Sequence, residues 1–260
     1  MTRYLGIWGA LVRAALQAET QFRASFIAKL FRNAGWLGFV LVATLVIFGN
    51  ASSIGGWDRG DSLALVATLF LVSAISNMFF HSVSEIPQHV RTGTLDFYLS
   101  KPVDSQFWIS VRRFNVGELG SFIAAIALLL YGLRGATHVT GLGVAGYVVG
   151  VMCGVGLYYS LNLVLMTLGI WLVRVDNLWV LTETISSVAR YPLDMYGLAI
   201  RRFLVTWVPL GLLAYAPASM LVKGFDGGMV LTSVAWATVA LAGSRLFWHW
   251  ATRSYSSASS

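Results

Sequence analysis

The stretch WLGFVLVATLVIF, from Trp36 to Phe48, decides the fold class of this 260-residue chain. It carries no charged side chain and shows no alternation of apolar and polar residues. Strands of outer-membrane barrels alternate apolar and polar positions over about 10 residues, whereas a membrane-spanning helix is apolar almost throughout. The stretch therefore predicts a helix within a lipid bilayer.

The overall composition supports the same class. Hydrophobic residues make up 57% of the chain and charged residues 11%, whereas soluble domains carry about 25% charged residues. The net charge of +7 is explained by basic residues kept on the cytoplasmic side of a membrane. No basic stripe of the kind that binds nucleic acid is present. Cys153 is the single cysteine, which excludes an internal disulfide and a thiolate metal cluster.

Six spans are predicted, because a hydrocarbon core about 30 Å thick takes roughly 20 apolar residues per helix. The expected fold is an all-α integral membrane protein with its transmembrane domain at residues 35–260. Asp61 or Ser62 is expected to cap the second span. Five spans have clear bounds: Gly35 to Phe48, Leu63 to about Phe80, Phe114 to Leu133, Leu142 to Val173 and Gly228 to about Trp248.

Residues 1–34 are expected to lie along the membrane surface. From Tyr4 to Phe31 apolar residues recur near helical spacing, with Arg13, Glu19 and Arg23 among them. A helix that crossed the bilayer would bury these charges, at about 2.5 to 3.5 kcal/mol each near its centre. The segment is therefore predicted to be an amphipathic connecting helix in contact with lipid headgroups.

The fifth crossing has two possible forms. In one, a short span runs outward from Asn177 to about Ala189, the chain turns at Tyr191 and Pro192, and residues 203–222 form a re-entrant segment before the sixth span. In the other, residues 177–202 stay cytoplasmic and residues 203–221 cross the membrane. The second form keeps Arg190, Arg201 and Arg202 inside, as the positive-inside rule prefers.

The charge distribution also predicts the orientation. Five basic residues precede the first span, and four more lie in the polar loop at residues 81–113. The loops after the first and third spans hold only Arg59 and Arg134. Both termini and the polar loop are therefore expected in the cytoplasm, with the chain in an inner or plasma membrane.

Residues with catalytic or metal-binding potential are few. The chain has no G-x-x-x-x-G-K-[ST] phosphate loop, so it is not expected to hydrolyse ATP or to be an enzyme. Its four histidines are too scattered for a zinc site. Glu183, Thr184 and Ser187 are candidates for a polar translocation cavity, although a helix that is simply not in lipid explains them equally well. Glycines at 146, 150 and 154 are expected to form a smooth packing stripe.

The most informative segment is the polar loop. Gly93 is expected to end a helix, Thr94 to cap a new short helix with Asp96 in its first turn, and Pro102 to stop it. Leu95, Tyr98 and Leu99 share one side of that helix, which fits a groove on a partner protein. The alternative is a loop helix packed on its own bundle.

The loop resembles that of a known family, the type-2 permeases of bacterial ATP-binding-cassette exporters, in a branch whose substrates are mostly unassigned. Further similarities are Gly56-Trp57 and Arg190-Tyr191-Pro192, and the resemblance covers nearly the whole chain. Pro87 departs from the family pattern because it stands inside an expected helix. The residues that carry the resemblance are Glu85, Val90, Arg91, Gly93, Leu95, Asp96, Leu99, Lys101 and Pro102.

The resemblance implies a function and partners. The loop helix would couple this chain to separate ATPase subunits that bind ATP and Mg²⁺, through Glu85, Arg91, Gly93, Leu95, Asp96, Tyr98, Leu99, Lys101 and Pro102. A second permease chain, identical or sister, would complete the transporter. The resemblance also prefers the re-entrant form of the fifth crossing. An amphipathic or apolar substrate is expected, since no cluster of charges lies within the spans. A membrane-embedded enzyme or a scaffold subunit is the alternative.

Overall fold

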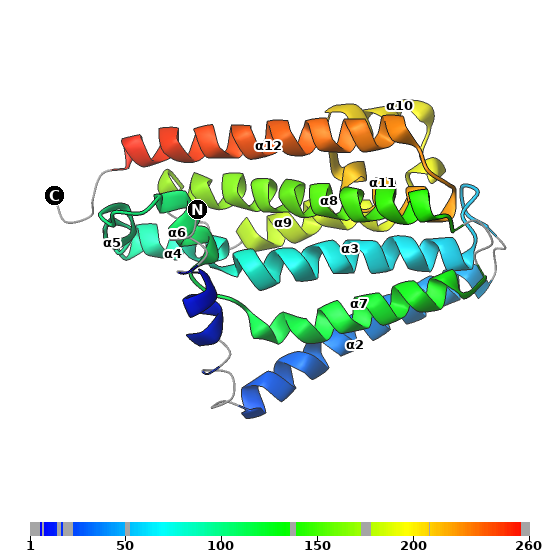
Figure 1. Ribbon diagram of the computed structural model, residues 1–260, viewed down its shortest axis with the longest axis horizontal. Helices are drawn as coiled ribbons and strands as arrows, with labels where there is room; N and C mark the ends of the chain where they lie inside the picture. The colour runs from blue at the N-terminus through cyan, green and yellow to red at the C-terminus, as the bar shows by residue number, and fades with distance from the viewer. Residues whose placement is uncertain are drawn as a thin grey trace.

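All regular structure in the described part of the chain is helical (Figure 1). The computed structural model describes residues 6, 8–14, 17, 23–49, 53–135, 139–172, 178–207 and 209–255; the side chains at 23–34, 135, 179, 183, 188 and 206 are not described. Within these ranges the sole β-type pairing is an isolated bridge between Ile54 and Trp57. The predicted all-α class is confirmed.

The first long helix, α2, runs without a break from Arg23 to Gly49. The helix therefore continues through the predicted boundary between Phe31 and Gly35, and the division into a connecting helix and a first span stays a prediction. No proline interrupts this stretch, and a Cβ at Gly35 would meet nothing within 4 Å. Neither a proline kink nor a close contact ends the helix there.

The chain upstream of α2 is described only in part. Residues 8–14 are helical, and Trp8 stacks on Phe79 with ring centroids 5.9 Å apart. The remaining residues of the predicted connecting helix before Arg23, apart from 6 and 17, lie outside the described residues. Its position along the membrane surface stays a prediction.

Helix α3 (Arg59–Phe80) begins with a capping box. The Asp58 carboxylate accepts a hydrogen bond from the Asp61 backbone N–H at 2.8 Å, and the Asp61 side chain accepts one from Asp58 N–H at 3.5 Å. The N-cap is thus Asp58, not Asp61 or Ser62 as predicted. Asp58 has the extended backbone that an N-cap requires, and its oxygen satisfies an unpaired N–H of the first turn.

The remaining elements follow in order. The polar loop forms η1 (His81–Glu85), α4 (Ile86–Arg91), α5 (Asp96–Leu99) and α6 (Ser105–Val111). Next come η2 (Val116–Glu118), α7 (Leu119–Gly132), η3 (Leu133–Gly135), α8 (Gly141–Thr167) and η4 (Leu168–Ile170). The last part holds α9 (Leu178–Ser187), η5 (Val188–Arg190), η6 (Leu193–Met195), α10 (Leu198–Arg202), η7 (Phe203–Trp207), η8 (Pro209–Leu212), α11 (Tyr215–Val222) and α12 (Gly227–Ser254).

The bundle has two distinct ends. In Figure 1 the polar loop with α4, α5 and α6 lies at the left, and α10 lies at the right. Helix α12 ends beside the polar loop, because Trp248 Nε1 donates to Ser105 Oγ at 3.2 Å. At the other end, which we call the far end, the turn before α3 meets η6: Trp57 Nε1 donates to Asp194 Oδ2 at 2.6 Å.

The glycines of α8 pack within the chain. A Cβ at Gly143 would stand 2.8 Å from Met220 O, one at Gly150 2.8 Å from Pro217 Cβ, and one at Gly154 2.7 Å from Leu213 O. The predicted packing role of the stripe is confirmed, and its partner is the segment that ends in α11. These contacts extend from Gly143 to Gly154, which are eleven helical steps apart in α8. The segment that ends in α11 therefore reaches about 17 Å into the bundle from the far end.

The described residues between α9 and α12 form short elements, and the choice between the two forms of the fifth crossing stays a prediction. Leu178 packs beside Ile86 in the core of the polar-loop end, whereas Asp194 lies at the far end, so α9 and η5 connect the two. The described residues at 203–207 and 209–221 form a π-turn, a 3₁₀ turn and a short α-helix, and none of these described elements is long enough by itself to cross a bilayer. Their placement in a membrane remains a prediction.

Three described helices are long and apolar enough to cross a membrane: 59–91, counted through η1 and α4, 141–170, counted through η4, and α12. A fourth is reached if α6 and residues 116–132, which meet at 55°, form one bent span. The described apolar part of α2, Gly35–Gly49, is shorter. A multi-pass membrane protein is therefore supported, and the count of six spans stays a prediction.

Candidate functional site

The polar loop forms a compact unit at one end of the bundle. Its first helix, α4, contains Pro87 in the first turn, where a proline needs no hydrogen-bonded N–H. The ring packs closely on Gly169, because a Cβ there would stand 2.9 Å from Pro87 Cβ. The departure from the family pattern at Pro87 thus has a local explanation: η1 ends at Glu85 and a new helix begins after it.

The turn after α4 depends on Gly93. Its φ of +68° lies in the left-handed region that favours glycine, and it lets the chain reverse after Arg91. Thr94 does not cap α5 as predicted, because no side chain caps that helix and its N-cap position is Leu95. Instead, Thr94 Oγ1 lies 2.8 Å from His89 Nδ1, so its hydroxyl is used across the turn.

Leu95 points into the chain. Its side chain is fully buried in a second apolar core with Ile86 and Ile109. The prediction that Leu95 would face a partner's groove is wrong, because the four residues of α5 fold back over α4 and α6 and need an apolar anchor there. Tyr98 and Leu99 are partly buried and pack against the same core.

Glu85 holds the loop together electrostatically. Its carboxylate forms ion pairs with Arg112 and with Arg113, the latter with Nη1 2.7 Å from Oε1. Arg112 in turn donates to Tyr98 OH at 2.7 Å and to His89 Nε2 at 2.6 Å. We call these five residues the Glu85 cluster. It joins the start of α4, α5 and the end of α6.

The protonation of His89 follows from this geometry. A guanidinium can only donate, so His89 Nε2 accepts from Arg112, and the ring proton lies on Nδ1 and is donated to Thr94. Burial first, and then the positive charge of Arg113, hold the pKa of His89 below its usual value. The imidazole is therefore neutral at neutral pH.

The loop is also fixed to α8 and α12. Arg245 Nη2 lies 2.6 Å from Asp104 Oδ2, an ion pair that holds the pKa of Asp104 below its usual value. Gln106 Nε2 donates to Tyr159 OH at 3.0 Å, and Ser110 Oγ lies 2.9 Å from the same hydroxyl. A displacement of α6 must therefore move these two long helices.

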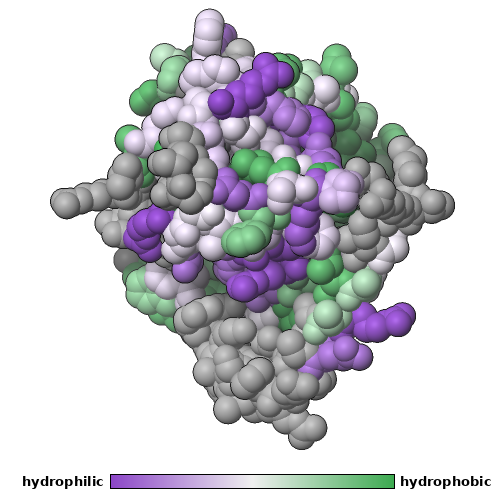
Figure 2. All heavy atoms as spheres, turned by 90° about the vertical axis from the view of Figure 1, so that its left-hand side faces the viewer, coloured by the Kyte–Doolittle hydropathy of each residue, from purple (hydrophilic) through white to green (hydrophobic). Residues whose placement is uncertain are grey.

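The outer surface of the loop is polar with one large apolar exception. Figure 2 shows this end of the molecule, with hydrophilic residues gathered around small hydrophobic areas. Phe97 on α5 is 69% exposed, which is unusual for an aromatic side chain surrounded by polar residues. Phe97 is not among the predicted coupling residues; of those, Arg91, Lys101 and Pro102 are exposed, and Asp96 is partly exposed.

The residues predicted to form a polar cavity lie on α9. Thr184 is exposed and its hydroxyl donates to Val180 O at 2.8 Å, while Ser187 donates to Thr184 O at 2.7 Å. Both hydroxyls are thus used within their own helix. The side chain of Glu183 lies outside the described residues. Ser187 also lines a small cavity, together with Ser186 and Arg190.

A second charged cluster, which the sequence does not reveal, lies at the far end. Asp194 accepts hydrogen bonds from Trp57 Nε1 at 2.6 Å, Tyr215 OH at 2.8 Å and Lys223 Nζ at 3.0 Å, and pairs with Arg201 at 2.7 Å. Partial burial opposes its charge, but the hydrogen bonds outweigh burial and lower the pKa of Asp194. We call these five residues the Asp194 cluster.

The comparison with protein families agrees with the loop. The model of a family described as ABC-2 family transporter protein matches residues 34–259. The chain belongs to this family. The resemblance inferred from the polar loop is thereby confirmed. Members of the ABC-2 family are membrane permease subunits of ATP-binding-cassette transporters and normally work with ATPase partners. A comparison with curated proteins gives no significant match.

Proposed function

We propose that this ABC-2 permease exports an amphipathic or apolar substrate from the cytoplasm, driven by separate ATPase subunits. The observation that supports it best is the polar loop, a rigid charged unit fixed to two long helices at one end of the bundle. In this proposal the termini and the loop are cytoplasmic, and the chain lies in a bacterial inner membrane. A second permease chain lies beside the first in the same membrane, and the substrate passes between them.

The loop transmits movement because its connections are stiff. The Glu85 cluster prevents α4, α5 and α6 from moving separately, and the Asp104–Arg245 pair joins α6 to α12. ATP-driven closure of the ATPases would push on the exposed side of α5. The whole unit would then shift with α8 and α12 as a rigid body, and so alternate access to the substrate.

Phe97 is the proposed contact with the ATPase, because Leu95 is used inside the chain. Phe97→Asp should weaken copurification of the ATPase by at least about 10-fold, since it places a charge in an apolar contact at a cost above about 1.4 kcal/mol. Substrate-stimulated ATP hydrolysis should fall in parallel.

Thr92→Asp is the matched control, because it adds the same charge at an exposed position of the same loop. It should change copurification by less than about twofold. Normal assembly and coupling in Phe97→Asp, at wild-type expression, would rule out α5 as the coupling contact.

A further inference from the structure

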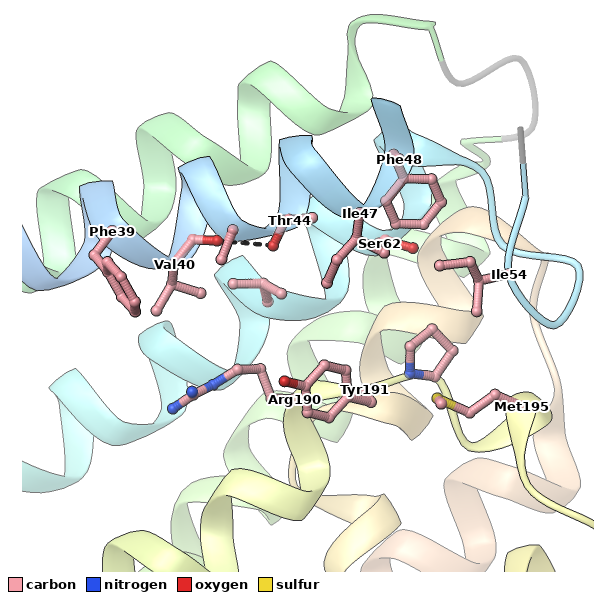
Figure 3. Close-up of a pocket in the computed structure, with 13 residues that line it drawn as sticks. Phe39, Val40, Thr44, Ile47, Phe48, Ile54, Ser62, Arg190, Tyr191 and Met195 are labelled. Carbon is pink, nitrogen blue, oxygen red and sulfur yellow. Dashed lines mark hydrogen bonds between the residues drawn. The ribbon is translucent and has the colours of Figure 1, made fainter. Parts of the chain in front are cut away.

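The cavity between α2 and the η5–η6 connection is the most distinctive apolar space that the described residues enclose (Figure 3). Its volume of about 210 Å³ exceeds the roughly 150 Å³ of an engineered cavity that takes up benzene, but falls below the range of sites for drug-sized molecules. One alkyl chain therefore fits, and a whole lipid does not. The lining residues are Phe39, Val40, Ala43, Thr44, Ile47, Phe48, Ile54, Ser62, Val66, Arg190, Tyr191, Pro192 and Met195.

Arg190 is the charged residue of this lining. Its guanidinium lies toward the Phe39 end of the cavity, and Met195 lies toward the Ile54 end (Figure 3). The cavity follows α2 from Phe39 to Phe48, ten residues joined by nine helical steps, which is about 14 Å. A cation thus stands at one end of an elongated apolar space.

This cation has no acidic partner among the side chains that the structure describes. It lies over the ring of Trp36, 5.8 Å from its centroid, and its Nε is buried without a hydrogen-bond acceptor. Arg190 is partly buried, and a buried guanidinium N–H without an acceptor is costly; a charged side chain of this kind in a membrane protein is a functional-site hypothesis by default. An acceptor supplied from outside the chain would remove that cost.

A second donor lies beside it. Arg190 also lines a smaller cavity of about 40 Å³ with Ser73, Ser186 and Tyr158. The Ser186 hydroxyl is buried there, and no described atom is its hydrogen-bond partner. Arg190 and Ser186 thus place two buried, unpaired donor atoms on the lining of one small cavity, beside the end of the apolar cavity that Arg190 lines. An anionic oxygen would satisfy both of them.

We propose that this site binds an anionic amphiphile, with its charged group at Arg190 and Ser186 and its alkyl chain along α2 toward Met195. If this site is where the substrate binds, the inference rests on the export function proposed above, and it narrows the substrate class to single-chain anionic amphiphiles. Binding itself does not depend on transport, because all of the residues that form the site belong to this chain.

The test is equilibrium binding to the purified full-length chain in phosphatidylcholine nanodiscs, without the ATPase. The probes are decyl phosphate, inorganic phosphate and decyl maltoside, which separate the contributions of charge and chain. Decyl phosphate should saturate one site, and octyl phosphate should bind about 15-fold more weakly, since two fewer methylenes are buried. Equal binding of inorganic and decyl phosphate would overturn the amphiphile site.

Variants locate the site. Arg190→Gln should weaken decyl phosphate binding by at least about 10-fold, and Ala43→Phe, which fills the cavity from α2, should do the same. Arg190→Lys keeps the charge and should retain most of the affinity. Arg202→Gln removes an exposed arginine that does not line the cavity and should change nothing.

Two results would overturn the proposal. One is wild-type affinity in Arg190→Gln. The other is binding that is seen only in Glu183→Gln, because it would mean that the chain's own carboxylate is the partner of Arg190. Site-specific binding of decyl phosphate without its export by the complete transporter would instead contradict the proposed transport role and leave the binding site intact.

Discussion

The Glu85 cluster and the Asp194 cluster each pair one carboxylate with basic and aromatic residues, but they differ in how far apart their members lie in the sequence. Glu85 gathers Arg112, Arg113 and His89, and all of them come from residues 81–113. Asp194 gathers its partners from separate segments, and Trp57 is 137 residues away in sequence. The Glu85 cluster therefore builds a local unit. The Asp194 cluster joins the turn before α3, residues 194–201 and residues 215–223, which are separate in sequence. Damage to the first should stay within the loop, and damage to the second should loosen the far end.

The largest effect is expected from Glu85→Gln. It leaves Arg112 without its carboxylate at a site where the arginine side chain is only 12% exposed. Breaking a buried pair on one side costs about 3 to 5 kcal/mol, and we expect about 2 to 3 kcal/mol here because Glu85 is 18% exposed. Hydrogen exchange should rise across residues 85–113 and stay unchanged at residues 191–197.

Arg113→Gln is the control for this variant. The Arg113 side chain is 63% exposed, so its pair with the same carboxylate is worth under about 1 kcal/mol. If both variants loosen the loop equally, the buried Arg112 is not what holds it.

Asp194→Asn should have an intermediate effect. The amide oxygen can still accept from Trp57 and Tyr215, but the ion pairs with Lys223 and Arg201 are lost. Both cations are more than one third exposed, so the expected cost is about 1 kcal/mol. Faster exchange should appear at residues 191–197 and 53–58 together.

Trp57→Phe provides the comparison for Asp194→Asn, because it removes one hydrogen bond and no charge. Hydrogen exchange should become faster in the turn before α3, at residues 53–58, while Lys223 keeps its ion pair with Asp194. Faster exchange confined to residues 191–197 in Asp194→Asn would mean that Asp194 does not join the separate segments.

The smallest effect concerns pH and separates the clusters chemically. The folded-state pKa of His89 is lowered, so the folded chain binds fewer protons there than the unfolded chain. Its contribution is present above the unfolded pKa of about 6.5 and is lost as the pH falls toward the folded value. When the pH is lowered from 7.5 to 5.5, the protection of residues 85–100, measured relative to the intrinsic exchange rate at each pH, should fall modestly.

The Asp194 cluster should not respond in this pH range. The pKa of Asp194 lies below its ordinary value near 3.8, so its contribution falls only at lower pH. His89→Gln keeps an acceptor for Arg112 and should abolish the change in the loop. A persistent pH response in that variant would point to another group.

The elements that the sequence predicted well are those set by local patterns. Long apolar runs gave α3, α8 and α12, and glycine spacing gave the packing face of α8. Gly93 ended α4 because only a left-handed residue fits there. These features depend on neighbours in the chain, which a single sequence displays.

The misplaced features depend on contacts that are distant in sequence. An apolar residue such as Leu95 looks the same in the sequence whether it contacts a partner or the chain's own core. Only the packing of α5 on α6 determines that Leu95 is buried within the chain. Asp194 stands in an ordinary Pro-Leu-Asp turn, with no signal that Trp57 would reach it. Between Phe31 and Gly35 the chain stays helical, since no proline interrupts it, and the sequence pattern does not show that the two predicted parts share one helix.

The attachment of α12 to the loop has a mechanical consequence. The helix spans 28 residues, about 42 Å, and is held near its C-terminal end by Arg245 and Trp248. A tilt of about 5° at that attachment would carry its other end, about 27 to 32 Å away, through about 2 to 3 Å. Under the export function proposed above, the helix would act as a lever arm, and a small rotation at the loop would become a displacement of about 2 to 3 Å at the far end.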